Sequence, residues 1–175
     1  ANDGVQGPSV ANYLKNTVGD KKVCVVDDSA DYGTGLAKAV RDTLGPVADS
    51  ACNISVKKGD KDFSAAVTQV KGQSPDSVFY SGYYSEAAPF VQQLRDAGFA
   101  GKFVSADGTK DPEFVKQAGE SSKDAVLSCP CGPASAAFAD EYTKKFNQGP
   151  GTYSTEGYDL GTIMAKGISS GAVTR

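Results

Sequence analysis

Short strand-like segments alternate with amphipathic helical segments as far as residue 129, and this alternation restricts the possible folds more than any other feature. Five segments rich in apolar and β-branched residues are typical of buried strands; they lie at 23–28, 50–56, 76–82, 102–108 and 125–129. The segments between them carry apolar residues three and four positions apart, as helices do. Helices that alternate with buried strands cover both faces of a parallel sheet. The prediction is an α/β fold: a three-layer sandwich with a parallel central sheet.

The pattern changes after Pro130. Two helices are predicted at 134–147 and 153–170, with no strand between them and with Gly149-Pro150-Gly151 as the break. A chain of 175 residues suffices for one domain and part of another. We therefore expect an α/β domain at 1–129 and a helical segment at 130–175.

Histidine is absent from the sequence, which removes the commonest general base and the commonest zinc ligand. The 18 basic and 21 acidic side chains give a formal net charge of −3, without a cluster of Lys and Arg. Because a nucleic-acid surface needs such a cluster, no nucleic-acid partner is expected. No apolar run approaches the ~20 residues that cross a bilayer. Neither a metal site nor a cofactor is predicted.

The cysteines leave two interpretations open; they are Cys24, Cys52, Cys129 and Cys131. Two structural disulfides in an oxidising compartment and four inert buried thiols fit the spacing equally well. Cys24 and Cys52 lie on strands expected to be neighbours, so they can approach disulfide distance. Cys129 and Cys131 flank a proline, and only a tight, unusual loop would join them. We favour an extracytoplasmic protein with a Cys24–Cys52 disulfide.

Ligands of open parallel sheets bind beyond the carboxyl ends of the strands. Tyr32 follows the first of those ends here, Tyr83 the third and Asp107 the fourth, where it stands in an Asp-Gly turn. A carboxylate can pair with an ammonium group, and tyrosine rings can contact that group by cation–π interaction and shield it from water. The three residues predict a site for a small ammonium-bearing ligand. The alternative interpretation is that tyrosines and Asp-Gly turns are ordinary loop residues.

Two enzyme-like patterns occur near the same ends, and neither is complete. Asp27-Asp28 resembles the acidic pair of a phospho-accepting receiver domain, but the aspartate and lysine required after the third and fifth strands are absent. We expect these two acids to cap or solvate their loop. Gly33-Thr34-Gly35 resembles the start of a dinucleotide fingerprint, but Lys38 stands at the third glycine position. These glycines are expected to let a helix begin close to the sheet, and the chain is not predicted to be an enzyme.

Longer runs resemble one family along essentially the whole chain. In order, the chain contains QGPSVANYL, VVDDSADYGTGLAKAV, GDKDFSAAVTQVK, FYSGYYSEAAPFVQQLRDAGF, FVSADG and GTYSTEGYDLGTIMAKGI. These runs resemble the branched-chain amino acid binding proteins of ABC importers, which are type I periplasmic binding proteins with two α/β lobes and the ligand between them. In that family the QGP helix begins the second lobe. The resemblance therefore implies a fragment: the second lobe at 1–129, and at 130–175 two helices that pack on the other lobe.

The same resemblance implies four ligand contacts. The tyrosine of the family's YG motif falls on Tyr32, its Gly-Tyr-Tyr tyrosine on Tyr83, and its acid that binds the α-ammonium on Asp107. An aromatic contact falls on Tyr153. Relatives often carry glutamate where Asp107 stands. The shorter side chain leaves the exact ligand open among amino acids, amides and other small polar solutes.

The implied function is that of a solute receptor without enzymatic activity. Such a receptor binds an amino acid, branched-chain or related, or an amide between two lobes that close by a hinge motion. It is extracytoplasmic, either periplasmic or a cell-surface lipoprotein, and its partner is an ABC permease in the membrane. The alternative is a ligand-sensing domain of a receptor or regulator with the same fold.

One consequence of the implied fragment concerns the last helix. Without the other lobe, its apolar stripe is expected to bury against the α/β domain or against a second copy of the chain; the stripe comprises Tyr158, Ile163, Met164 and Ile168.

Overall fold

The computed structural model describes residues 2–171. The chain divides into two compact units, the first ending at Pro130 and the second beginning at Cys131. We call residues 2–130 the sheet unit and residues 131–171 the helical unit, and describe each by itself.

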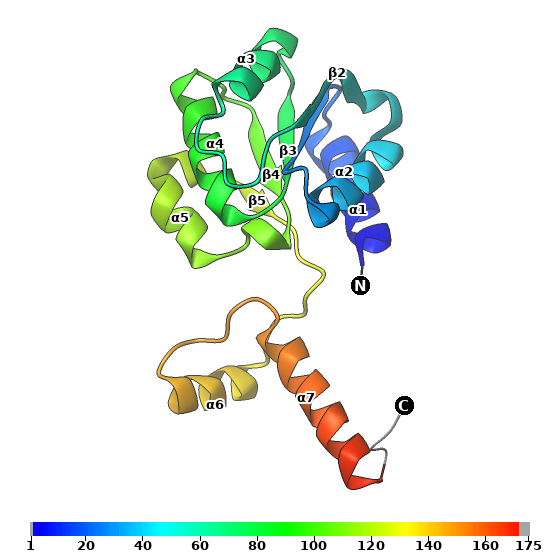
Figure 1. Ribbon diagram of the computed structural model, residues 1–175, viewed down its shortest axis with the longest axis vertical. Coiled ribbons are helices and arrows are strands. Elements are labelled where there is room, and N and C mark those ends of the chain that lie inside the picture. The colour runs from blue at the N-terminus through cyan, green and yellow to red at the C-terminus, as the bar shows by residue number, and fades with distance from the viewer. Residues whose placement is uncertain (1, 172–175) are drawn as a thin grey trace. The chain divides into compact units, whose positions relative to one another are not determined.

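Five parallel strands form one sheet in the described residues, in the order β2-β1-β3-β4-β5 (Figure 1). The strands are β1 (Val23–Asp27), β2 (Ala48–Ser55), β3 (Ser77–Ser81), β4 (Lys102–Ser105) and β5 (Val126–Leu127). The helices of the sheet unit are α1 (Asp3–Asn12), α2 (Asp31–Leu44), α3 (Ser64–Gln73), α4 (Tyr84–Asp96) and α5 (Pro112–Ala118). Figure 1 shows α1 and α2 on one side of the sheet and α3, α4 and α5 on the other. The predicted three-layer α/β sandwich is confirmed.

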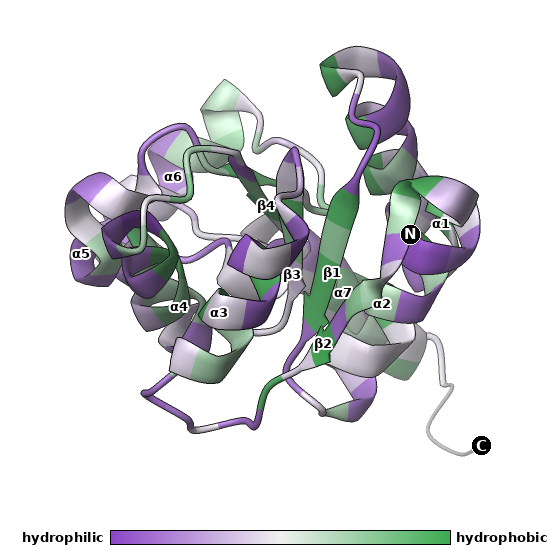
Figure 2. Ribbon diagram, turned by 90° about the horizontal axis from the view of Figure 1, so that it is seen from above, coloured by the Kyte–Doolittle hydropathy of each residue, from purple (hydrophilic) through white to green (hydrophobic). Residues whose placement is uncertain are grey.

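Each face of the sheet carries its own buried cluster, because successive side chains of a strand point to opposite faces. The face covered by α3, α4 and α5 contributes Cys24, Val26, Cys52, Ile54, Val78, Tyr80 and Phe103. The face covered by α1 and α2 contributes Val23, Val25, Phe79 and Val104. Both faces of β1 are therefore apolar, and the strand is coloured as hydrophobic along nearly all its length (Figure 2).

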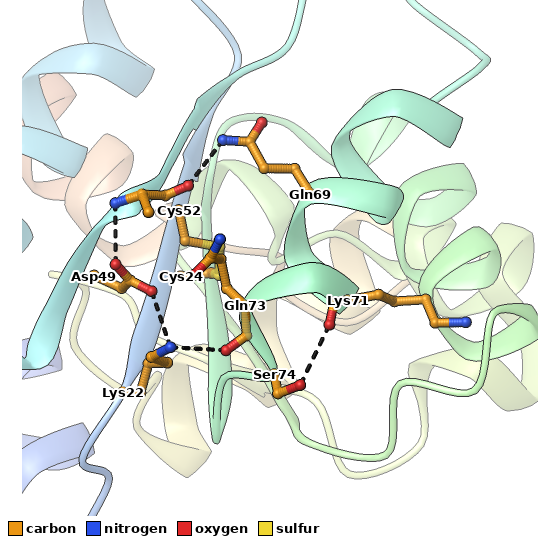
Figure 3. Close-up of a disulfide and its surroundings, with 9 residues drawn as sticks. Lys22, Cys24, Asp49, Cys52, Gln69, Lys71, Gln73 and Ser74 are labelled. Atoms are coloured by element: carbon orange, nitrogen blue, oxygen red, sulfur yellow. Dashed lines mark hydrogen bonds and ion pairs between the residues drawn. A yellow bond between two sulfur atoms is a disulfide. The ribbon is translucent and has the colours of Figure 1, made fainter.

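A disulfide joins Cys24 on β1 to Cys52 on β2, with 4.9 Å between the Cα atoms (Figure 3). Both residues are buried on the same face of the sheet. The prediction of this disulfide is confirmed. Cys129 and Cys131 are disulfide-bonded as well, and no cysteine is free in the described chain. The alternative of four buried thiols is wrong.

Apolar residues at helical spacing behind Pro8 predict a first helix over residues 8–18, with Pro8 in its first turn. Instead α1 begins at Asp3, contains Pro8 in its interior, and continues into a π-helical segment at Tyr13–Val18. The early start follows from packing against α2: a Cβ on Gly7 would meet the Ala39 side chain, so only glycine permits this approach. Proline removes one backbone donor there, and packing outweighs that loss.

The helical unit contains α6 (Ala136–Phe146) and α7 (Ser154–Ser169), close to their predicted bounds. Ser135 caps α6 by accepting a hydrogen bond from the Phe138 N–H, at 3.2 Å. The rings of Phe138 and Tyr158 lie 5.5 Å apart and edge-on, which joins the two helices. No described residue of this unit is buried, and the side chains of the predicted apolar stripe are 59–67% exposed.

Candidate functional site

Three neighbouring strands bring their carboxyl ends together at one edge of the sheet, which we call the carboxyl edge. The strands are β1, β3 and β4, which lie side by side in the sheet. Asp28 donates its N–H to the carbonyl of Ser81 at 3.1 Å, and the Thr109 hydroxyl donates to the carbonyl of Gly82 at 3.2 Å. The segments that follow the three strands are therefore bonded to one another.

Asp107 lies two residues after the end of β4, where it begins a 3-10 turn at Asp107–Thr109. Its Oδ1 accepts hydrogen bonds from the Tyr32 hydroxyl at 2.9 Å and from the Gln6 amide at 2.8 Å. The N–H of Gly108 donates to the Tyr32 hydroxyl at 3.3 Å. Two donors on one oxygen hold the carboxylate in a single orientation.

Tyr32 lies in the first turn of α2, and Tyr83 directly precedes α4. The two ring centroids are 5.4 Å apart, with planes inclined at 47°. Tyr83 is 38% exposed, and the ammonium of Lys58 lies 5.1 Å from its ring centroid. The sheet unit thus brings three of the four predicted site residues into one group.

Two glycines allow the backbone to come this close. A Cβ on Gly108 would lie 2.7 Å from the carbonyl oxygen of Gly82 and 3.0 Å from the Tyr32 ring. A Cβ on Gly33 would lie 2.8 Å from the carbonyl oxygen of Ser81 and would collide with Asp28. Gly33 therefore lets α2 begin against the sheet, as its pattern predicted.

The acidic pair after β1 caps its loop. Asp27 Oδ1 accepts the Ser29 N–H at 3.1 Å, and Asp28 Oδ1 accepts the Ala30 N–H at 3.0 Å. Both carboxylates are buried, so the alternative that they are solvated is wrong. Asp27 also pairs with Arg41 at 3.4 Å. Burial raises the pKa of the Asp28 carboxyl, against the hydrogen bond from Ala30, and the nearby Glu86 carboxylate raises it further.

Tyr153 belongs to the helical unit, where it directly precedes α7 with a left-handed φ of 66°. Its role in the site stays a prediction.

Two further side chains at this edge were missed by sequence reasoning. Gln6 bonds to Asp107 and also donates to the Ser128 hydroxyl at 3.1 Å. Lys58 lies over the ring of Tyr83. Gln6 stands in the QGP run that carried the family resemblance, but its partners are more than a hundred residues away in sequence. No local pattern connects such distant positions.

A carboxylate next to two tyrosine rings can bind a cation, by charge and by cation–π contact. Among residues 2–171, no group of three or more His, Cys, Asp and Glu side chains could hold a metal ion. Within the same residues no helix has the length and apolar character needed to cross a membrane.

A parallel sheet covered on both faces, with polar and aromatic side chains at its carboxyl edge, is the arrangement of a ligand-binding α/β lobe. Residues 1–175 match the family model described as "Periplasmic binding protein". The chain belongs to the periplasmic binding protein family.

Two curated relatives are amino-acid binding proteins. The leucine-, isoleucine-, valine-, threonine- and alanine-binding protein of Pseudomonas aeruginosa is 28% identical over 174 residues, which cover 95% of this chain and 46% of the relative. The Leu/Ile/Val-binding protein of Escherichia coli K12 is 33% identical over 132 residues, which cover 73% of this chain and 35% of the relative.

Two solved structures share the fold. The branched-chain amino acid transporter substrate binding protein of Streptococcus pneumoniae, in complex with isoleucine, has a TM-score of 0.83 at 34% identity; the match covers 94% of this chain and 49% of that one. A leucine binding protein of Thermotoga maritima has a TM-score of 0.85 at 26% identity, with coverage of 96% and 50%. The chain therefore spans half or less of the length of these relatives. The sequence-based resemblance to branched-chain amino acid binding proteins is confirmed.

Proposed function

We propose that this chain is one lobe of a non-enzymatic, two-lobed receptor that binds an amino acid, branched-chain or related, or an amide. In this proposal the second lobe comprises residues 1–129, and the helices at 130–175 pack on the first lobe of the longer protein. The curated relatives named above support the ligand class, because their names specify branched-chain amino acids. The partial coverage of those relatives supports the assignment to one lobe.

The observation that carries the proposal is the group formed by Asp107, Tyr32 and Tyr83. A ligand ammonium bound beside Asp107 would gain a counter-charge, which a buried cation requires. The tyrosine rings would supply cation–π contact and exclude water. Tyr153 is proposed as a further contact, contributed from the segment that follows the lobe.

We propose an extracytoplasmic location, in the periplasm or as a cell-surface lipoprotein, with an ABC permease as the membrane partner. The Cys24–Cys52 disulfide supports this location, because structural disulfides persist mainly in oxidising compartments. Closure of the two lobes around the ligand would be a hinge motion, and the closed form would dock on the permease. No observation favours the alternative of a sensory domain.

The test is Asp107→Asn in the full-length protein. Asparagine keeps an oxygen that can accept from Tyr32 and Gln6 but removes the charge. Breaking a buried charge pair costs about 3–5 kcal/mol, so the affinity for leucine, isoleucine or valine should fall by about two to four orders of magnitude in calorimetry. The melting temperature of the unliganded protein should stay nearly unchanged.

A matched control is Asp42→Asn, which removes an exposed carboxylate that pairs with Lys38 one turn earlier in α2. Surface pairs of this kind contribute about 0–1 kcal/mol, so the control should bind like the wild type. If Asp107 only shapes its turn, asparagine would serve equally well. Unaltered affinity of Asp107→Asn would therefore refute the ammonium site.

A further inference from the structure

The side chain of Gln6 lies between the site carboxylate and the segment that leaves the sheet. Gln6 is only 5% exposed and comes from the first turns of α1. Its Nε2 donates to Asp107 Oδ1 at 2.8 Å and to the Ser128 hydroxyl at 3.1 Å. A primary amide nitrogen carries two hydrogens, so both are used.

The surroundings determine which way this amide points. The Ser128 hydroxyl donates to the carbonyl of Ser105 at 3.3 Å, which leaves its oxygen as an acceptor for Gln6. If the amide were turned over, its oxygen would face the Asp107 carboxylate, and two acceptors repel each other. Gln6 also lines a cavity of about 320 Å³ with the apolar side chains of Val10 and Val126. Apolar surroundings strengthen a hydrogen bond and make its loss more costly.

Gln6 and Tyr32 approach the same oxygen of Asp107 from different helices, α1 and α2. Tyr32 can rotate its hydroxyl hydrogen, and it also accepts the Gly108 N–H. Gln6 is anchored at its second hydrogen by Ser128, on the segment beyond β5. Both amide hydrogens of Gln6 are therefore engaged, whereas the Tyr32 hydroxyl keeps a rotatable hydrogen.

We propose that Gln6 is a positioning residue of the ligand site: it fixes the Asp107 carboxylate in the orientation that receives the ligand ammonium. Gln6 does not touch the ligand in this proposal and acts only through Asp107. The inference rests on the proposed function of Asp107 and adds to it a second residue on which ammonium recognition depends.

The experiment is a double-mutant cycle in the full-length protein, with L-isoleucine binding measured by calorimetry. Gln6→Met keeps the length of the side chain and removes both donors. It should weaken binding about tenfold, the scale of one hydrogen bond to a charged group. In the Asp107→Asn background the same substitution should weaken binding less than twofold, because the group that Gln6 positions is no longer charged.

Two more variants separate positioning from general damage. Gln6→Glu is isosteric but places an acceptor against the carboxylate, so it should weaken binding more than Gln6→Met does. Gln69→Met is the control: Gln69 lies on α3, far from Asp107 in the sequence, and its side-chain amide donates to the carbonyl of Ala51 at 3.0 Å. Loss of this bond should change affinity less than twofold.

The outcomes distinguish the two proposals. Equal losses for Gln6→Met in both backgrounds, or no loss in either, would overturn the positioning role while leaving the ammonium site intact. An Asp107→Asn variant with wild-type affinity would overturn the ammonium site, and the role of Gln6 with it. A tenfold loss confined to the background that retains Asp107 would support the inference.

Discussion

Phe90 in the sheet unit and Ile163 in the helical unit are both apolar residues of amphipathic helices, yet their environments differ. Phe90 is fully buried, and its ring centroid lies 5.5 Å from that of Phe63 and 5.8 Å from that of Tyr80. Ile163 is 67% exposed. The same contrast holds throughout: the sheet unit has two buried clusters, whereas no described residue of the helical unit is buried.

The contrast shows which part of the chain carries its own stability. Burial of apolar surface is the main favourable term in folding, and the sheet unit supplies it on both faces of its sheet. The helices of the helical unit are 11 and 16 residues long, and isolated helices of that length are marginal in water. Their exposed apolar residues fit the proposal that another lobe covers them. The sheet unit is thus self-contained for folding, but the proposed ligand site is not.

The largest predicted effect tests whether the proposed ligand site needs the other lobe. The 175-residue chain alone should bind amino acids at least a thousandfold more weakly than the full-length protein does. In the proposal the other lobe supplies the remaining ligand contacts, and a loss of about 4 kcal/mol corresponds to three orders of magnitude. Calorimetry against the twenty amino acids should show no tight binding. A micromolar isotherm would mean that the whole site lies in this chain.

The next effect is on stability, and it compares Phe90 in the sheet unit with Ile163 in the helical unit. Phe90→Ala should lower the free energy of unfolding of this chain by about 3–5 kcal/mol, because it leaves a cavity among aromatic rings. Ile163→Ala should change it by less than about 0.5 kcal/mol, as expected for an exposed position. Urea unfolding followed by fluorescence and circular dichroism measures both.

In the full-length protein, Ile163→Ala is expected to have a large effect on the free energy of unfolding. If the first lobe covers α7, Ile163→Ala should there cost about 2–5 kcal/mol. A loss of that size already in the isolated chain would contradict the exposure of this helix and indicate that a second copy buries it.

Periodicity in the sequence was enough to predict the sheet and most of its helices. The strands of the sheet unit are short and apolar on both faces, and such runs between amphipathic helices allow few other folds. The start of α1 could not be predicted, because it depends on the close approach of Gly7 to α2. Propensity alone places a proline in a first turn, whereas packing extends this helix beyond Pro8 in the N-terminal direction.

The candidate site was predictable only in part, because some of its contacts also depend on packing between segments that are distant in the sequence. Tyr32, Tyr83 and Asp107 follow strand ends, and strand ends of a parallel sheet meet at one edge. Gln6 belongs to no strand end and reaches Asp107 only because α1 packs on the sheet. The burial of Asp28 was also missed, since a loop carboxylate is usually solvated and only the folded chain shows that this one is enclosed.

The third effect concerns the Cys24–Cys52 disulfide, which joins two strands of the sheet unit and should stabilise that unit. Cys24 and Cys52 are 28 residues apart in sequence, and a cross-link of that span stabilises by about 3–4 kcal/mol through the unfolded chain. The variant with Cys24→Ala and Cys52→Ala should lose about that much free energy of unfolding. Thiol counting of the denatured, unreduced wild type should find no free thiol, and four free thiols would contradict both disulfide assignments.

The smallest effect is a pH dependence that arises from a carboxyl buried in the sheet unit. Asp28 is enclosed among Glu86, Asp27, Lys58 and Tyr80, and burial is the main reason that its pKa is raised. Well below pH 4 the carboxyl is neutral in both the folded and the unfolded chain. As the pH rises, the unfolded chain ionises first, so the folded state loses stability until the pH passes the raised pKa.

Asp28→Asn removes this titration and keeps an acceptor for the Ala30 N–H. The free energy of unfolding of the variant relative to wild type should therefore rise from pH 4 towards neutral pH and then level off. Asp62→Asn is the matched control with the opposite sign, because the N–H of Ser64 lowers the pKa of the exposed Asp62 carboxyl. Its stability relative to wild type should fall at lower pH, as the pH rises from the lowered pKa to the usual value of about 4, and should stay flat above that. Urea unfolding at a series of pH values measures both differences, and parallel curves for Asp28→Asn and wild type would show that this carboxyl is not desolvated in the fold.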